Sequence, residues 1–81
     1  MPDELCPATV DLVQRFANAM AFKLGDAQKK YGYRDGWLTQ DWEAECRRHL
    51  MDHIEKGDPI DVAAYCAFMW ARGWSTKGQP L

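Results

Sequence analysis

Two histidines and two carboxylates lie close together near the middle of this 81-residue chain. His49 and His53 are four residues apart, so on a helix their rings lie one turn apart on the same face, which is a spacing used by metal ligands. Glu45 and Asp52 add carboxylates beside His49, and such a mixed cluster could bind a metal ion or a polar ligand. No third metal ligand of fixed spacing accompanies the histidines. We therefore favour the alternative, in which both histidines are half-buried interface residues that hydrogen-bond to neighbouring carboxylates.

The two histidines are expected to differ in environment. His53 lies nearer the centre of an apolar face that includes Trp42 and Cys46, and we expect it to have a structural role. His49 lies at the margin of that face, closer to Glu45, and is the better candidate for contact with a ligand or partner.

A second acidic pair, Asp58 and Asp61, has the spacing at which two carboxylates on a helix can share a magnesium ion. A helix boundary explains the same residues without a ligand. Gly57 ends one helix, Asp58 accepts hydrogen bonds from the free amides of the next, and Pro59 occupies the first helical position. We favour the capping interpretation for Asp58.

Aromatic residues gather in the segment between residues 31 and 42. Tyr31, Tyr33, Trp37 and Trp42 accompany Arg34, and such a group could stack on a base and bind a phosphate. The alternative is that the rings cover one end of a small core, and we favour it. Gly32 and the pair Asp35-Gly36 predict a loop here.

The hydrophobic spacing predicts an all-α fold: one three-helix domain over residues 1–81, packed as a small bundle and completed by oligomerisation. The predicted helices cover about 8–30, 40–56 and 59–72, and 75–81 form a flexible tail. Apolar residues of the first helix recur at alternating steps of three and four, the seam of a helix that packs on another helix: Val10, Val13, Ala17, Met20, Leu24, Ala27 and Tyr31.

Two boundaries follow from single residues. Gly25 costs about 1 kcal/mol relative to alanine inside a helix, which predicts a bend or an end of the first helix at that position. Thr39 or Asp41 can accept a hydrogen bond from the first turn of the second helix, so we expect that helix to begin there.

The third helix is apolar on every side, because ten apolar residues follow one another from Val62 to Ala71. A helix of this kind must be covered all round, and a chain of this length has little left to cover it. We therefore predict a homo-oligomer. Its expected interface consists of the large side chains of this helix: Tyr65, Phe68, Met69 and Trp70.

Composition narrows the class of partner and the compartment. The formal charge of −2 gives no general attraction to phosphates, so a nucleic-acid partner is disfavoured. The three cysteines are odd in number and lack CxxC spacing, and the first residues lack the pattern of a signal peptide. We expect reduced cysteines and a cytoplasmic protein. The apolar run is too short to span a bilayer, so no membrane association is expected.

The segments KYGYRDGW, ECRRHL and EKGDPIDVAAYCAFMWARGW, in this order between Lys30 and Trp74, resemble a group of short proteins encoded by tailed phages and prophages. More distantly, the chain is similar to the all-helical MazG-like dNTP pyrophosphohydrolases. The positions that match are Tyr31-Gly32, Trp37, Arg48-His49, and Gly57-Asp58 with Asp61.

The chain departs from the MazG-like pattern at its metal ligands. Those enzymes hold magnesium with a Glu-x-x-Glu on one helix and a Glu-x-x-Asp on the next. This chain has no Glu-x-x-Glu, and no carboxylate follows Asp61 in the third helix. We therefore expect a non-catalytic, self-associating binding protein of phage type that needs no cofactor and that sequesters a nucleotide or blocks a host factor. The alternative is a minimal magnesium-dependent pyrophosphohydrolase with a site shared between subunits, using Glu45, His49, Asp52, Asp58 and Asp61.

Overall fold

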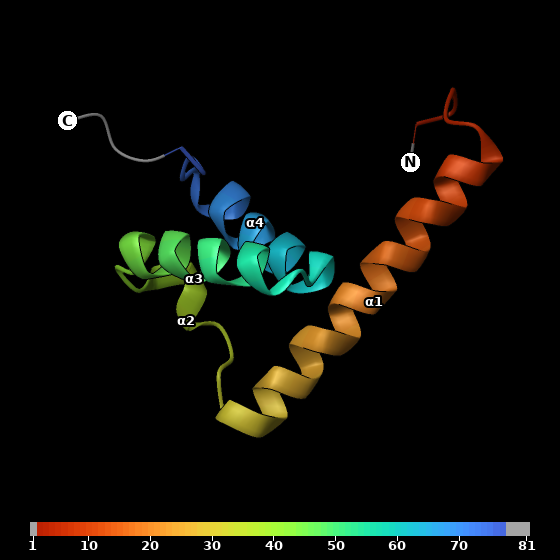
Figure 1. Ribbon diagram of the computed structural model, residues 1–81. Coiled ribbons are helices and arrows are strands. Elements are labelled where there is room, and N and C mark those ends of the chain that lie inside the picture. The colour runs from red at the N-terminus through yellow and green to blue at the C-terminus, as the bar shows by residue number, and fades with distance from the viewer. Residues whose placement is uncertain (1, 78–81) are drawn as a thin grey trace.

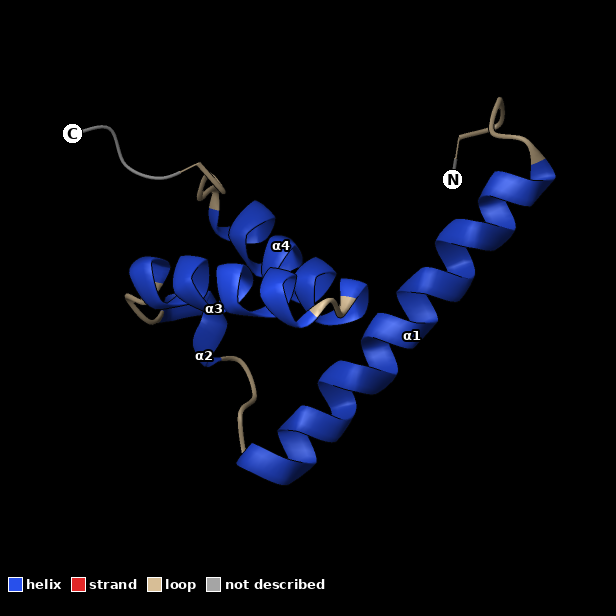
Figure 2. Ribbon diagram, in the orientation of Figure 1, coloured by secondary structure: helices blue, strands red, loops and turns tan. Residues whose placement is uncertain are grey.

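A computed structural model describes residues 2–77 of the chain, and its regular elements there are all helices (Figure 1, Figure 2). Helix α1 spans Pro7–Tyr31, α2 spans Gly36–Thr39, α3 spans Glu43–Lys56 and α4 spans Pro59–Arg72. The predicted all-α fold is confirmed. Among the residues described, no helix has the length and apolar character needed to cross a membrane.

Helices α2, α3 and α4 form a small body around a compact hydrophobic core. Its fully buried members are Cys46 and Leu50 from α3 and Met69 from α4. Half-buried side chains surround them: Trp42, Val62, Tyr65, Cys66, Phe68 and Trp74. The apolar face predicted for α3 is therefore the face that packs on α4, although Ile54 at its end is exposed.

The junction between α3 and α4 follows the predicted pattern. Gly57 ends α3 with a φ of 81°, a left-handed conformation that glycine adopts without steric cost. Asp58 Oδ1 then accepts hydrogen bonds from the backbone amides of Ile60, at 3.0 Å, and Asp61, at 3.4 Å, while Pro59 occupies the first position of α4. The predicted cap is confirmed, and it fixes the turn between the two helices that build the core.

The segment before α3 differs from the prediction. Residues expected to form a loop include the short helix α2, and α3 begins at Glu43 with Trp42 as an N-cap that makes no side-chain capping bond. Neither Thr39 nor Asp41 caps α3. The physical reason is a set of tertiary bonds to the carbonyl of Trp37, which accepts from Trp42 Nε1 at 3.2 Å and from Arg72 at 2.7 Å. These bonds hold α2 as a separate turn against α4.

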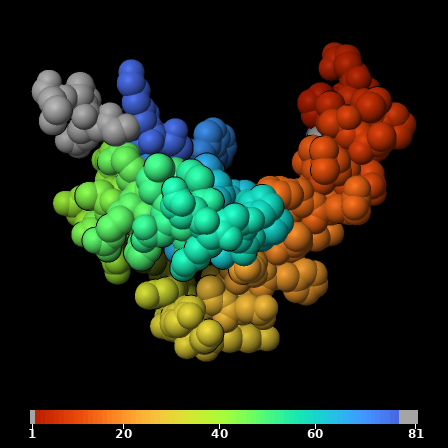
Figure 3. Space-filling view, viewed as in Figure 1, coloured from red at the N-terminus to blue at the C-terminus, as the bar shows by residue number. Residues whose placement is uncertain are grey.

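Helix α1 continues through Gly25, where a bend or an end was predicted. It is 25 residues long and contains no buried residue. It packs on α4 through the stretch in which Met20, Leu24, Gly25 and Ala27 are half-buried, whereas its N-terminal half, orange and red in Figure 3, projects beyond the body. The molecule therefore has two parts, a packed body and a helical arm.

The segment after α4 is partly defined. Gly73 ends α4 in a left-handed conformation, and the amide of Trp74 donates to the carbonyl of Met69 at 2.8 Å. The carbonyl of Ser75 accepts from Arg47 at 2.9 Å. The rest of the predicted tail, residues 78–81, lies outside the described residues.

Candidate functional site

A polar cluster lies where α1, α3 and α4 meet. Lys23 of α1 places its Nζ atom 2.6 Å from Asp58 Oδ2 and 3.5 Å from Asp61 Oδ2, so one ammonium group bridges both carboxylates. On the other side of Asp61, the Nδ1 atom of His53 lies 3.4 Å from the same Oδ2 atom. We call Lys23, His53, Asp58 and Asp61 the junction cluster.

The electrostatics of the junction cluster come mainly from Lys23. Its hydrogen bond to Asp58 lowers the pKa of that carboxyl group to about 2, and the capping bonds from the amides of α4 act in the same direction. The same contact raises the pKa of Lys23, with Asp61 adding to the effect. The cation between Asp58 and Asp61 is thus the ammonium group of Lys23, at the position where the spacing of the two carboxylates suggested a magnesium ion.

Both histidines of α3 lie against the ring of Tyr65 from α4. The ring centroids of His49 and Tyr65 are 5.7 Å apart and those of His53 and Tyr65 are 5.2 Å apart, in stacked orientations. The Nδ1 atom of His53 is buried and, within the described residues, accepts or donates no hydrogen bond of good geometry. Both histidines are half-buried, as predicted, and pack on one aromatic side chain, but within the described residues neither forms the predicted hydrogen bond to a carboxylate.

The remaining carboxylates of the predicted site do not join the junction cluster. Glu45 and Asp52 are exposed on α3, and neither makes a side-chain hydrogen bond or ion pair within the described part of the chain. No group of three or more His, Cys, Asp or Glu side chains in residues 2–77 comes together so that it could hold a metal ion. Of the predicted acidic and histidine residues, only His53, Asp58 and Asp61 belong to the junction cluster, where they are not arranged to hold a metal ion, and His49 stacks on Tyr65 outside the cluster.

The aromatic segment divides into two groups. Trp37 is half-buried and packs on Phe68 with ring centroids 5.5 Å apart, so it covers one end of the core as the favoured interpretation predicts. Tyr31 and Tyr33 are exposed, with centroids 5.8 Å apart, and Arg34 is exposed next to them. This second group remains a candidate for contact with a ligand.

The predicted oligomer interface on α4 requires a correction. Met69 is 1% exposed and belongs to the protomer's own core. Tyr65 and Phe68 are half-buried and pack against that core, and Trp70 is 85% exposed. Helix α4 packs against α1, α2 and α3, but only Ala64 and Met69 of its residues are buried, so the protomer covers the apolar helix in part.

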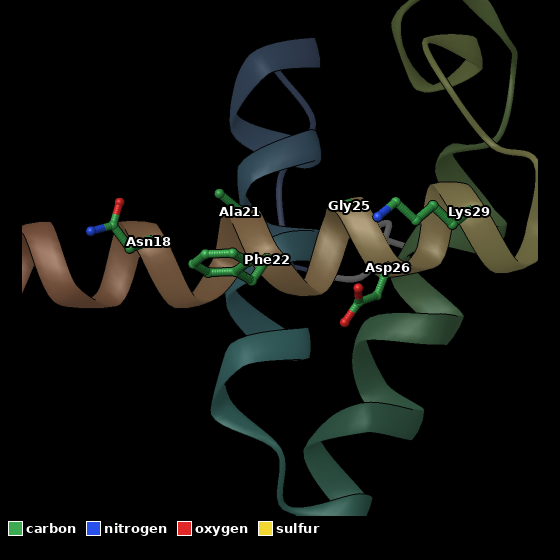
Figure 4. Close-up of a pocket in the computed structure, with 6 residues that line it drawn as sticks. All are labelled: Asn18, Ala21, Phe22, Gly25, Asp26 and Lys29. Carbon is green, nitrogen blue, oxygen red and sulfur yellow. The ribbon is translucent and has the colours of Figure 1, made fainter.

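A further apolar surface that no other helix of the protomer covers lies on α1. A shallow apolar depression on the N-terminal half of this helix is lined only by Leu12, Val13, Phe16, Ala17 and Met20. A second depression lies around Gly25, and Figure 4 shows its lining residues on the face of α1 that points away from the other helices. Phe22, on that outer face, is 77% exposed.

Two contributions were missed by reasoning from the sequence. Lys23 lies 35 residues before Asp58, and no local spacing links a lysine on one helix to the cap of another. Arg72 donates to the carbonyls of Trp37 and Gln40, at 2.7 and 2.8 Å, and its guanidinium lies 4.4 Å from the ring centroid of Trp74. Both residues carry their roles through tertiary contacts that local patterns do not encode.

Comparison with known proteins identifies no relative. No protein-family model matches the chain, no curated protein matches it, and no solved structure matches its fold.

Proposed function

We propose that this protein is a small, non-catalytic, self-associating binding protein. The observation that carries the proposal is the excess surface of the single chain. A folded monomer of 9.3 kDa exposes about 5,000 Å², whereas this chain exposes 6517 Å². The difference between these two accessible areas is larger than the roughly 800 Å² that each partner buries in a standard interface.

The dimensions of the chain support the same proposal. A compact domain of this length has a radius of gyration of about 12 Å, and the value here is 14.3 Å. Helix α1 contributes to this difference, because it has 25 residues and none of them is buried. A helix of this length in a small protein is stabilised mainly by packing of its apolar face, so association with another chain supplies what the protomer lacks.

The junction cluster supports binding over hydrolysis. A pyrophosphohydrolase of MazG type needs carboxylates that are free to hold magnesium against a triphosphate. Here Asp58 is engaged by Lys23 and by the amides of α4, and Asp61 lies between Lys23 and His53. Displacement of Lys23 would be required before a metal could bind this pair.

The resemblance to short phage and prophage proteins suggests where the protein acts and what it binds besides itself. We place the protein in the cytoplasm of an infected or lysogenic bacterium, where it sequesters a nucleotide or blocks a host protein. We assign nucleotide binding to the exposed residues Tyr31, Tyr33 and Arg34, since aromatic rings can stack on a base and a guanidinium can bind a phosphate. Nucleic acid is disfavoured by the formal charge of −2.

Two measurements test this function. Sedimentation velocity at micromolar concentration is expected to show an oligomer, and a stable monomer would contradict self-association. Incubation with dNTPs and magnesium is expected to release no pyrophosphate. Turnover that disappears in the Asp61→Asn variant would favour the pyrophosphohydrolase instead.

A further inference from the structure

We infer that two copies of the chain associate by packing the N-terminal halves of their α1 helices against each other in antiparallel orientation. This inference rests on the proposed self-association and names the surface and the geometry. The surface consists of Leu12, Val13, Phe16, Ala17 and Met20, which line the apolar depression, and we call it the arm face.

The arm face is the uncovered half of one continuous stripe. Residues 13, 17, 20, 24 and 27 follow steps of three and four and therefore share one side of the helix. In the second half of α1, Leu24 and Ala27 are half-buried where α4 packs, and Lys23 binds the start of α4. In the first half, Leu12, Val13 and Phe16 are 55, 41 and 37% exposed. The same stripe is thus used by the protomer in one half and left for a partner in the other.

The chemistry of the arm face fits a second copy of itself. Its five residues carry no charge, and the nearest charged side chains, Asp11 and Arg15, form an ion pair of 2.8 Å with each other. Large and small side chains alternate, with Ala17 beside Phe16, so a bulky residue of one copy can lie over a small residue of the other. A self-complementary patch of this kind closes into a two-fold dimer.

The position of the body determines the orientation. Because α4 packs on the same stripe that forms the arm face, a parallel pair would bring both bodies to the same end and the same side, where they would collide. An antiparallel pair places the bodies at opposite ends. The stretch that projects beyond the body begins with Pro7 and ends at Ala19, next to the half-buried Met20, so its midpoint lies near Val13. A pair centred there brings Cys6 of one copy opposite Met20 of the other.

A matched pair of variants tests the surface. Phe16→Glu is expected to raise the dissociation constant at least about 100-fold, because it places an unpaired carboxylate in a dry contact. Phe22→Glu makes the same change on the outer face of α1 and is expected to leave the dissociation constant unchanged. Circular dichroism checks that both variants keep their helices, as expected for two residues outside the core.

Cross-linking tests the orientation. Cys6 is exposed, whereas burial raises the pKa of the Cys46 thiol to about 11 and keeps that residue unreactive. Under mild oxidation with diamide, Met20→Cys is expected to give a covalent dimer whose linked peptides join positions 6 and 20, and the native chain is expected to give little. A Cys6 to Cys6 link in the native chain would establish a parallel pair and overturn the orientation.

The remaining outcomes separate the two proposals. An oligomer that persists in Phe16→Glu and forms no link between positions 6 and 20 would overturn the arm-face interface and leave self-association standing. A native chain that sediments as a monomer would overturn both, and would leave the arm face to a different protein.

Discussion

Helix α4 and the N-terminal half of α1 both carry apolar residues, but they differ in how far the protomer buries those residues. The ten apolar residues of α4 predict a helix that needs a second subunit, and within the protomer the packing of α1, α2 and α3 buries Ala64 and Met69 and leaves Trp70 85% exposed. The apolar stripe of α1 predicts packing on another helix, and in the N-terminal half of this stripe Leu12, Val13 and Phe16 are exposed. Apolar composition therefore predicts that a helix will be buried, and the packing of the chain determines which surfaces bury it.

The difference has a simple geometric origin. The residues of α4 that accompany the large side chains are small, and Ala64 is buried, which allows neighbouring helices to approach closely. Helix α1 is 25 residues long, about 37 Å at 1.5 Å per residue. Helix α4 crosses α1 and does not run along it (Figure 4), so the N-terminal part of α1 extends beyond the body (Figure 1).

The largest effect should come from the core of the body. Met69→Ala removes a side chain that is 1% exposed and is expected to lower the free energy of unfolding by about 2–5 kcal/mol. Met51→Ala makes the same change at a residue that is 53% exposed on α3 and is expected to change it by less than about 0.5 kcal/mol. Urea denaturation measures both. Equal, small losses would mean that Met69 does not belong to the protomer core.

Much of the body could be predicted from the sequence because its signals are local. Gly57, Asp58 and Pro59 specify a helix end and a helix start with their own backbone preferences, and the structure has both. The junction cluster could be predicted only in part. Asp58 and Asp61 are close in sequence, but Lys23 reaches them from another helix, so only the packing of α1 on α4 brings them together.

Two glycine substitutions should have opposite signs. Gly57→Ala places a Cβ atom at a φ of 81° and is expected to lower the free energy of unfolding by about 1–2 kcal/mol. Gly25 is in the interior of α1, and a Cβ atom there would meet nothing within 4 Å. Gly25→Ala is therefore expected to raise helix stability by about 0.5–1 kcal/mol. Thermal denaturation measures both, and a loss of stability in Gly25→Ala would show that the outer face of α1 is covered.

The junction cluster should make the free energy of unfolding depend on pH in the acid range. Because the folded-state pKa of Asp58 is about 2, below its ordinary value of 3.8, the contribution is present above pH 4 and is lost as pH falls toward 2. Lys23→Met removes the main cause of the lowered pKa, so its urea midpoint should fall less than that of the native chain over this range. Arg15→Met, which breaks the exposed pair with Asp11, serves as the control and should follow the native profile. Parallel curves for native chain and Lys23→Met would show that the ion pair does not form.

The smallest effect should come from Trp70, one of the four residues of α4 that the sequence predicts as an interface. Trp70 is 85% exposed on α4, so Trp70→Ala removes few contacts and is expected to change the free energy of unfolding by less than about 0.5 kcal/mol. If the arm face is the interface, the sedimentation coefficient of this variant should equal that of the native chain, while Phe16→Glu sediments as a monomer. The reverse result, dissociation by Trp70→Ala and none by Phe16→Glu, would return the interface to α4. In that case the apolar helix would both fill the core with Met69 and join two subunits through Trp70, and the contrast between the two helices would fail.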